Sequence, residues 1–358
     1  MKPAIRAEAE RLYAAFLAAG ALPVDADILL PAETLLDLYG EDIRARAYVT
    51  TDPTLGEMML RPDFTVPVVQ AHMAHGADPT RYCYRGEVFR SQENPGPREY
   101  LQVGFEVFDR TAPELADAEV FALFAGLLAA TTARPVTGDI GILRAAVQGL
   151  DTSDRRKAAL LRHIWRPQRF RALLDRFAGR APVPEARAAL LHRLVTGPVE
   201  VLMQAAGPLV GLRTAEEIAV RAEALIEDAK AVPIAAPEAA LLYDLLSLQA
   251  PADAALSHLR GITFLLPAIQ PAVDRFAARL AALRDRGIDT GRLAFEASLG
   301  RASMEYYDGF TFSFLADGLP PIATGGRYDA LTAVLGQGRS IPAVGGVIQP
   351  ALVLQVRA

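Results

Sequence analysis

Residues 81–108 read RYCYRGEVFRSQENPGPREYLQVGFEVF, which combines strand-forming residues with side chains that can bind polar ligands. Gln102, Gly104 and Glu106 lie two residues apart, so in an extended strand they share one face. Gly104 leaves a gap between two polar groups, which suits the floor of a site for a small polar ligand. A solvated face is the alternative interpretation, because antiparallel sheets often expose one face to water.

Two arginines flank the loop SQENPGP of this segment: Arg90 ends the first run and Arg98 begins the second. A guanidinium fork matches the paired oxygens of a carboxylate or a phosphate. On spacing alone, surface charge at the tip of a hairpin is the better account of both.

Three further segments carry residues that could bind a ligand. LRPDFT places Asp63 and Thr65 at the start of a predicted helix, where either side chain could also be an ordinary cap. MEYYDGFTF places Tyr306 and Tyr307 side by side in a predicted strand, so at most one of them faces a ligand on a given side. ATGGRYDAL joins a predicted Gly-Gly turn to Arg327 before a helix, and such a turn can approach an anion closely.

Metal and cofactor sites have little support in the sequence. His72 and His75 are three residues apart on a predicted helix, but no third ligand is evident. The single cysteine, Cys83, excludes an internal disulfide framework and a cysteine-cluster metal site. No P-loop, GxSxG or GxGxxG pattern occurs. We expect neither a metal nor a cofactor.

The elements that must position these residues fall into three blocks. Residues 1–149 mix helices, predicted near 2–20, 64–76 and 114–130, with strands of an antiparallel sheet, and a short helix is predicted at ETLLDLYG. Residues 150–260 are Leu/Ala/Arg runs separated by prolines, which predict a helical insertion. Strand patterns return in 261–358. Neither strand-bearing half has enough strands alone, so the sequence predicts one shared sheet and an α+β fold.

Composition limits the function classes. A chain of 358 residues with 51% hydrophobic residues can bury a sizeable core. The net charge of −5 gives no support to nucleic-acid binding. The N-terminus lacks the continuous apolar core of a signal peptide, and VFALFAGLLAATTA is too short to span a membrane. We expect a soluble cytoplasmic protein that binds neither nucleic acid nor membrane.

Taken in order and spacing, these segments resemble the core of histidyl-tRNA synthetase, a class II aminoacyl-tRNA synthetase. DILLPAETLLDLYGED resembles the family's first motif, which implies a self-dimer through the region near residues 31–39. The segment around Arg90 resembles the second motif, with the family's arginine at that position. The three segments around Asp63, Tyr306 and Arg327 resemble parts peculiar to the histidine enzyme. The resemblance implies an antiparallel sheet flanked by helices as the floor of a ligand site.

The resemblance also implies roles for single residues. Asp63, Thr65 and Gln102 would hold the α-amino group of free histidine, and Glu106 and Tyr307 would hold its two imidazole nitrogens. A carboxylate and a hydroxyl can bind both ring positions at once. The full set of candidates is, for histidine, Asp63, Thr65, Arg98, Gln102, Glu106, Tyr306 and Tyr307, and, for a vestigial nucleotide site, Arg90 and Arg327.

Departures from the synthetase pattern point to a non-catalytic relative. Ala302 and Leu352 stand where the synthetase has arginines, and the chain stops at Ala358, so we expect no anticodon-binding domain. This combination resembles the regulatory subunits of ATP phosphoribosyltransferase, a synthetase-like family. That resemblance implies no catalytic activity of its own, a short catalytic subunit as partner in the first step of histidine biosynthesis, activation of that subunit, and coupling to histidine feedback.

Two other functions are weighed against this one. A truncated synthetase-like enzyme that activates histidine with ATP is disfavoured, because the lost arginines would stabilise charge in the phosphoryl transition state. A structural or tRNA-binding module with a dead pocket is disfavoured by the joint presence of Asp63, Thr65, Gln102, Glu106 and Tyr307.

Overall fold

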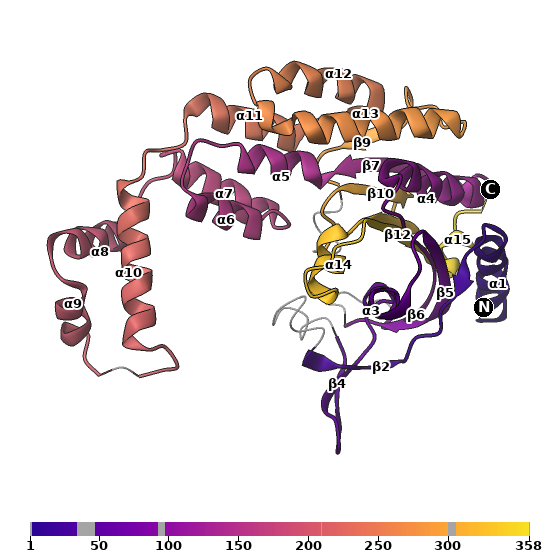
Figure 1. Ribbon diagram of the computed structural model, residues 1–358, viewed down its shortest axis with the longest axis horizontal. Coiled ribbons are helices and arrows are strands. Elements are labelled where there is room, and N and C mark those ends of the chain that lie inside the picture. Colours follow the sequence, from indigo (N-terminus) through magenta and orange to yellow (C-terminus); the bar gives the residue numbers. More distant parts are fainter. Residues whose placement is uncertain (1, 34–46, 92–96, 209, 300–305, 358) are drawn as a thin grey trace. The chain divides into compact units, whose positions relative to one another are not determined.

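The computed structural model describes residues 2–33, 47–91, 97–208, 210–299 and 306–357 (Figure 1). The chain divides into two compact units: Met1–Ala145 with Leu245–Ala358, and Ala146–Asp244. The sequence predicts a helical insertion over residues 150–260. The second unit ends earlier because residues 249–251 already form a strand that pairs within the first unit.

The first unit is built on one large sheet, which within the described residues has nine strands in the order β1-β5-β6-β12-β11-β10-β7-β9-β8. All pairings are antiparallel except β1 with β5 and β7 with β9. Strands on both sides of the helical insertion join it, which confirms the predicted shared sheet and the α+β class. The strands are β1 (Leu22–Pro23), β5 (Thr80–Phe89), β6 (Glu99–Phe108), β7 (Arg134–Asp139), β8 (Gln249–Pro251), β9 (Ala294–Glu296), β10 (Phe310–Leu315), β11 (Ala323–Arg327) and β12 (Ala343–Ile348).

A second, three-stranded sheet has the order β2-β4-β3. Its strands are β2 (Leu29–Pro31), β3 (Val49–Asp52) and β4 (Gly56–Leu60). β3 and β4 pair antiparallel on either side of the turn DPTLG. The helix predicted at ETLLDLYG, and with it most of the predicted dimer segment, lies outside the described residues.

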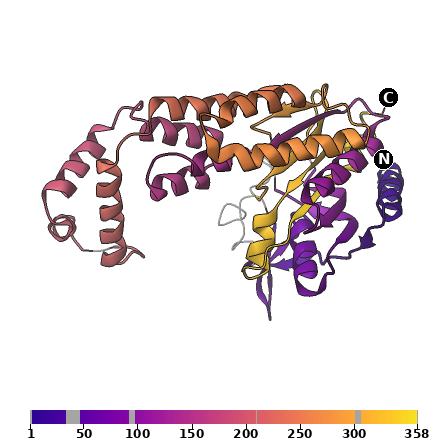
Figure 2. The ribbon, with the colours of Figure 1, turned by 45° about the horizontal axis from the view of Figure 1, so that its top comes forward.

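Helices pack against the large sheet, and the core lies between these helices and the sheet. α4 and α13 lie side by side, with α12 next to α13 (Figure 2). Phe121 and Phe124 of α4 pack against the β10 phenylalanines, with ring centroids 5.7 Å and 5.3 Å from Phe312. The helices of this unit are α1 (Lys2–Ala18), α3 (Thr65–His75), α4 (Pro113–Leu128), α12 (Ala252–Thr263), the 3₁₀ helix η2 (Pro267–Ile269), α13 (Gln270–Asp285), α14 (Asp329–Leu335) and α15 (Pro350–Val353).

The second unit is helical, as the Leu/Ala/Arg runs predict. Proline precedes or begins three helices of this unit: Pro167 occupies the first turn of α7, and Pro184 and Pro198 precede α8 and α9. Thr214 and Glu217 form a capping box at the start of α10. The helices are α6 (Asp154–Arg162), α7 (Pro167–Phe177), α8 (Glu185–Thr196), α9 (Val199–Ala205) and α10 (Ala215–Lys230), and α5 (Ile140–Gln148) and α11 (Ala236–Ser247) cross the boundaries of the unit.

No helix in the described ranges is long and apolar enough to cross a lipid bilayer. The candidate stretch, residues 120–133, begins within α4 and continues past the end of the helix at Leu128, and its Phe121 and Phe124 are fully buried in the core.

Strand β6 is buried on both faces over the stretch that carries the candidate residues. Phe105 packs against Phe16 of α1, with ring centroids 5.3 Å apart. Gln102 and Glu106, on the other face, are each 1% exposed. A solvated face is therefore the wrong interpretation of the Gln102, Gly104 and Glu106 spacing. The two polar side chains on this face are buried.

Candidate functional site

A cavity of about 120 Å³ lies over the face of the sheet that carries Gln102 and Glu106. It is contained in the first unit, and its walls come from β6, β11, β12, the start of α3 and the segment before β10. The cavity is lined by Asp63, Thr65, Arg90, Gln102, Glu106, Tyr306, Tyr307, Pro321, Ile322, Ala323, Thr324, Tyr328, Gly345, Gly346, Val347 and Gln349. The structure thus brings together seven of the nine candidates that the sequence analysis singled out.

Glu106 is held at the floor of the cavity by hydroxyl groups. Tyr84 donates to Oε1 at 2.8 Å, and Thr65 donates to the same oxygen at 3.3 Å. Tyr328 donates to Oε2 at 2.7 Å. None of these donors carries a positive charge, so the carboxylate is hydrogen-bonded but its charge is not neutralised by them.

Close approach of neighbouring strands fixes the position of Glu106. A Cβ atom at Gly345, its partner on β12, would lie 1.4 Å from Oε2, so only glycine leaves room for the carboxylate. A Cβ atom at Gly104 would lie 2.1 Å from the ring of Tyr84. The gap that the sequence analysis predicted at Gly104 is therefore filled by Tyr84, the cross-strand partner of this glycine.

Burial raises the pKa of Glu106 from its ordinary value of 4.5 to about 7, although the hydrogen bonds from Tyr328, Tyr84 and Thr65 oppose the rise. Glu106 therefore keeps its proton to a higher pH than an exposed glutamate does. A cationic or proton-donating ligand atom beside it would favour the charged carboxylate.

Gln102 is the second polar group on this floor. Its side-chain oxygen Oε1 is fully buried and has no hydrogen-bond partner, although the residue lines the cavity. A buried acceptor without a donor costs about 1–3 kcal/mol, so such atoms are rare unless a water or a ligand completes them. The cavity therefore calls for a ligand that donates hydrogen bonds.

Residues from the start of α3 and the end of β5 form another wall. Asp63 is buried and accepts a long hydrogen bond, 3.5 Å, from the backbone of Val66. Thr65, the first residue of α3, accepts a hydrogen bond from Tyr306 at 3.3 Å. Arg90 donates to the carbonyl of Pro62 at 2.7 Å. The wall thus brings a carboxylate and a guanidinium to the same cavity.

Tyr306 and Tyr307 do not lie in a strand. β10 begins at Phe310, and the two tyrosines precede it in a turn. Both line the cavity, with ring centroids 4.9 Å apart. The expectation that at most one of them faces a ligand is wrong, because strand alternation does not apply in a turn. Burial raises the pKa of Tyr307, so its hydroxyl keeps its proton.

Two candidates lie away from the cavity. Arg98 is exposed and does not line it. Arg327 is buried on another side, where it donates to Asp117 of α4 at 2.6 Å and to Asp329 at 3.0 Å. The predicted Gly-Gly turn before Arg327 is also wrong: Gly325 and Gly326 lie inside β11 and pair with β12.

The remaining sequence features do not form a site. His72 is buried, with its ring stacked on Phe108 at 3.9 Å, whereas His75 is exposed. The part of the chain that the structure describes holds no group of three metal-ligating side chains. Leu352 lies in α15, and Ala302 falls outside the described residues.

Sequence reasoning missed the two tyrosines that hold Glu106. Tyr84 follows Tyr82 with the two-residue spacing of one strand face, and Tyr328 lies inside the quoted segment ATGGRYDAL. Both signals were present, but their meaning depends on the pairing of β5 with β6 and of β12 with both β6 and β11.

Comparison with known proteins gives relatives over nearly the whole length. A family model described as histidyl-tRNA synthetase matches residues 3–250 and 229–351. An ATP phosphoribosyltransferase regulatory subunit of Allorhizobium ampelinum is 33% identical over 350 residues, which cover 92% of each chain. One from Chelativorans sp. is 34% identical over 349 residues, which cover 91% of this chain and 90% of the relative.

Solved structures share the fold. An ATP phosphoribosyltransferase regulatory subunit/histidyl-tRNA synthetase from Bacillus halodurans has a TM-score of 0.70 at 20% identity, and the match covers 100% of this chain and 80% of that one. A histidyl-tRNA synthetase from Nostoc sp. has a TM-score of 0.65 at 16% identity, and the match covers 99% and 71%. At these identities the likeness shows the fold alone: the class II synthetase-like core.

Proposed function

Because this chain belongs to the family of ATP phosphoribosyltransferase regulatory subunits, which have a histidyl-tRNA synthetase-like fold, we propose that it binds free histidine and regulates a catalytic subunit. The partner is a short-form ATP phosphoribosyltransferase, which the chain activates when histidine is scarce and inhibits when histidine is plentiful. The chain itself has no catalytic activity, and the complex works in the cytoplasm, in the first step of histidine biosynthesis.

The unpaired oxygen of Gln102, in the same cavity as Glu106, is the observation that carries the histidine assignment. Histidine offers what these groups lack, since its ammonium group and imidazole both donate hydrogen bonds. Glu106 and Tyr307 would take the two ring nitrogens. Asp63, Thr65 and Gln102 would take the ammonium group, and Arg90 supplies a positive charge for the ligand's carboxylate.

Calorimetric titration of the chain with histidine tests the site. Glu106→Ala removes the acceptor of an imidazole N–H, so we expect the affinity to fall by about tenfold or more. Glu99→Ala is the matched control, because Glu99 lies on the same strand, is exposed and does not line the cavity. Equal affinity in both variants would place the histidine site elsewhere.

Absence of catalysis is tested by pyrophosphate exchange. Leu352 stands where the synthetase has an arginine against ATP, and such donors contribute a few kcal/mol to phosphoryl transfer. We therefore expect exchange at background level with histidine and ATP. A histidine-dependent exchange rate would instead support a synthetase-like enzyme.

Regulation is tested with the short catalytic subunit, assayed with and without this chain across a histidine titration. A sensor acts only through differential affinity, so histidine must bind the inhibited state more tightly than the active one. A coupling of about 1–3 kcal/mol corresponds to a change of roughly 5- to 150-fold. If activity is the same with and without the chain, the regulatory function fails. If Glu106→Ala and Glu99→Ala transmit inhibition alike, the partner stands and the sensor site is wrong.

A self-dimer is also part of the proposal. Besides the resemblance of residues near 31–39 to the family's dimer motif, the small sheet carries exposed apolar side chains: Ile28 and Leu29 at β2, Val49 in β3 and Leu55 in the β3–β4 turn. Leu29 pairs with Leu60 and Val49 with Met59, so these side chains lie on both faces of the small sheet and do not form one patch. The dimer proposal therefore rests mainly on the resemblance and on symmetric dimers being the commonest assembly. Light scattering should give a dimer at micromolar concentration, and a monomer would count against the proposal.

A further inference from the structure

We propose that the helical second unit, Ala146–Asp244, carries a separate site for an organic polyphosphate, in a pocket lined by arginines. This inference does not depend on the histidine pocket, because all the residues that carry it belong to the second unit. It assigns a ligand to the helical insertion, which contributes no residue to the proposed histidine site.

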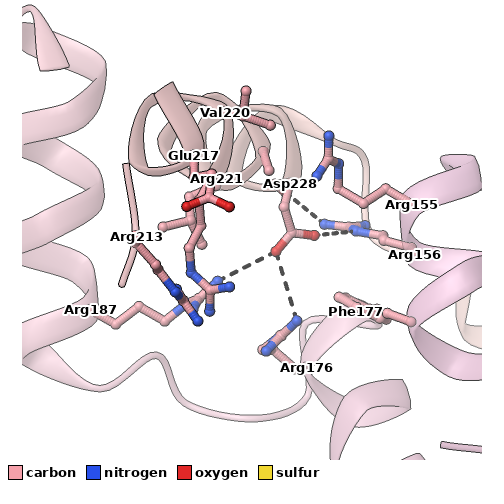
Figure 3. Close-up of a pocket in the computed structure, with 13 residues that line it drawn as sticks. Arg155, Arg156, Arg176, Phe177, Arg187, Arg213, Glu217, Val220, Arg221 and Asp228 are labelled. Atoms are coloured by element: carbon pink, nitrogen blue, oxygen red, sulfur yellow. Dashed lines mark hydrogen bonds and ion pairs between the residues drawn. The ribbon is translucent and has the colours of Figure 1, made fainter. Parts of the chain in front are cut away.

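The pocket has a volume of about 510 Å³ and is formed by α6, α7, α8, α10 and the residue before the cap of α10 (Figure 3). That volume falls in the range of about 300–1,000 Å³ that is common for small-molecule sites. Six arginines line it, against two acidic side chains, Glu217 and Asp228. The arginines are Arg155, Arg156, Arg176, Arg187, Arg213 and Arg221.

Asp228 is already engaged by Arg156. Arg156 donates from Nε to Oδ1 of Asp228 at 2.7 Å, and its other nitrogens donate to the carbonyls of Asp228 and Val232, both at 2.8 Å. With a side chain only 8% exposed, Arg156 joins α6 to α10. This pair is structural, and it leaves one carboxylate oxygen for the other guanidinium groups.

That remaining oxygen, Oδ2, is shared by two arginines at long distances. Arg187 lies 3.5 Å from it and Arg176 lies 4.0 Å from it. A normal charge-assisted hydrogen bond is about 2.7–2.9 Å long, so neither arginine is well paired there. Both side chains are partly exposed, 29% for Arg187 and 39% for Arg176, and can reach a ligand.

Arg213 and Arg221 add further positive charge on the same side. Figure 3 shows their guanidinium groups gathered next to that of Arg187. The nearby acid, Glu217, accepts a hydrogen bond from the backbone of Thr214 at 2.8 Å in the capping box. Like charges placed together repel each other unless an anion lies between them. Consistent with this, burial and the nearby Arg187 lower the pKa of Arg176.

The shape and chemistry of the pocket favour a polyphosphate with an organic part. Guanidinium forks match phosphate oxygens, and several arginines from different helices suit more than one phosphate group. Ala159, Val220 and Ala224 line the same pocket, and Val220 is 60% exposed there, which offers an apolar wall to a base or sugar. A concave pocket inside one helical unit suits a small molecule better than the extended surface that duplex nucleic acid needs.

The test is calorimetric titration of the full chain with inorganic tripolyphosphate, with ATP and with a short RNA duplex. The double variant Arg187→Gln/Arg213→Gln removes two pocket charges, and the control Arg193→Gln removes one exposed arginine of α8 outside the pocket. We expect at least one polyphosphate to bind, with affinity reduced by about tenfold or more in the double variant and unchanged in the control. Tighter binding of ATP than of tripolyphosphate identifies the organic ligand.

Three outcomes overturn the proposal. The first is that neither polyphosphate binds, and the second is that the double variant and the control lose the same affinity. The third is that the RNA duplex binds more tightly than either polyphosphate and loses affinity in the double variant. Histidine titration of the same variants separates this site from the proposed function. Unchanged histidine affinity in the double variant shows that its first unit is intact, and circular dichroism melting checks the helical unit. Arg221→Gln is a second probe in case the double variant unfolds.

Discussion

Glu106 in the cavity and Asp117 in an ion network are both buried carboxylates of the first unit, but Asp117 accepts hydrogen bonds from guanidinium groups and Glu106 accepts them from hydroxyls. Arg279 donates to Asp117 at 2.9 Å and to Asp139 at 2.9 Å. Arg327 donates to the other oxygen of Asp117 at 2.6 Å. Glu106 instead accepts hydrogen bonds from uncharged hydroxyls.

The difference separates a cluster of charges that stabilises the fold from a group of polar side chains that can bind a ligand. In the network, Asp117 is 1% exposed and lies between two arginines, so its charge is neutralised without a ligand. In the cavity, the charge of Glu106 is not neutralised by its donors, and Gln102 keeps an acceptor unpaired. A buried carboxylate that lacks a cation takes up either a proton or a positively charged ligand. Arg327 belongs to the first kind of cluster, which explains why it does not line the cavity.

The largest expected effect is on the network. Asp117→Ala leaves two buried guanidinium groups without their shared partner, which should lower the free energy of unfolding by about 3–5 kcal/mol. Urea unfolding followed by circular dichroism measures this. Glu119→Ala, on the same helix, breaks a partly exposed pair with Arg81 and should cost about 1 kcal/mol or less. An equal loss of unfolding free energy in the two variants would show that the buried network stabilises the fold no more than the partly exposed pair does.

The next effect concerns the pH dependence of stability. Folding raises the pKa of Glu106 from 4.5 to about 7, so the folded state holds this proton more tightly than the unfolded state does. The resulting stabilisation is complete below pH 4.5 and is lost as pH rises through 7. At about 1.4 kcal/mol per pKa unit, the loss is about 3 kcal/mol.

Urea unfolding at pH 4.5 and pH 8 tests this, with Glu106→Gln as the comparison. The variant cannot titrate at this position, so its stability should fall less than that of the wild type over the same interval. Asp308, whose pKa burial raises to about 6, remains in both chains and cancels in the difference. Parallel stability curves for the two chains would mean that Glu106 does not titrate near neutral pH.

The smallest effect is on the pH dependence of histidine affinity. We expect Glu106 and the ligand's imidazole to share one proton in the complex. The free groups have pKa values of about 7 for Glu106 and about 6.5 for the imidazole, so binding is favoured when one of the two is protonated and the other is not. Affinity should peak near neutral pH and fall by about tenfold per pH unit well outside this range. Calorimetry from pH 5.5 to 8.5 measures the profile. A flat profile in the wild type would show that Glu106 does not take the imidazole.

The sequence by itself determined the local features of this protein. Two-residue spacing placed Gln102 and Glu106 on one strand face, and the helical texture of the insertion followed from its Leu/Ala/Arg runs and prolines. Alternation and helix periodicity depend on neighbouring residues, so they can be predicted without knowing the fold. The order of the motifs then gave the class of the fold.

Only the tertiary structure decided which residues meet. Tyr84 fills the gap at Gly104 because β5 pairs with β6, and Tyr328 reaches Glu106 because β12 pairs with both β11 and β6. These pairings join residues far apart in sequence. Arg327 turns to Asp117 because α4 packs on the same sheet. The arginines of the second unit gather only when four helices pack together. Cross-strand register and helix packing set these contacts, and neither is encoded in the local spacing of side chains.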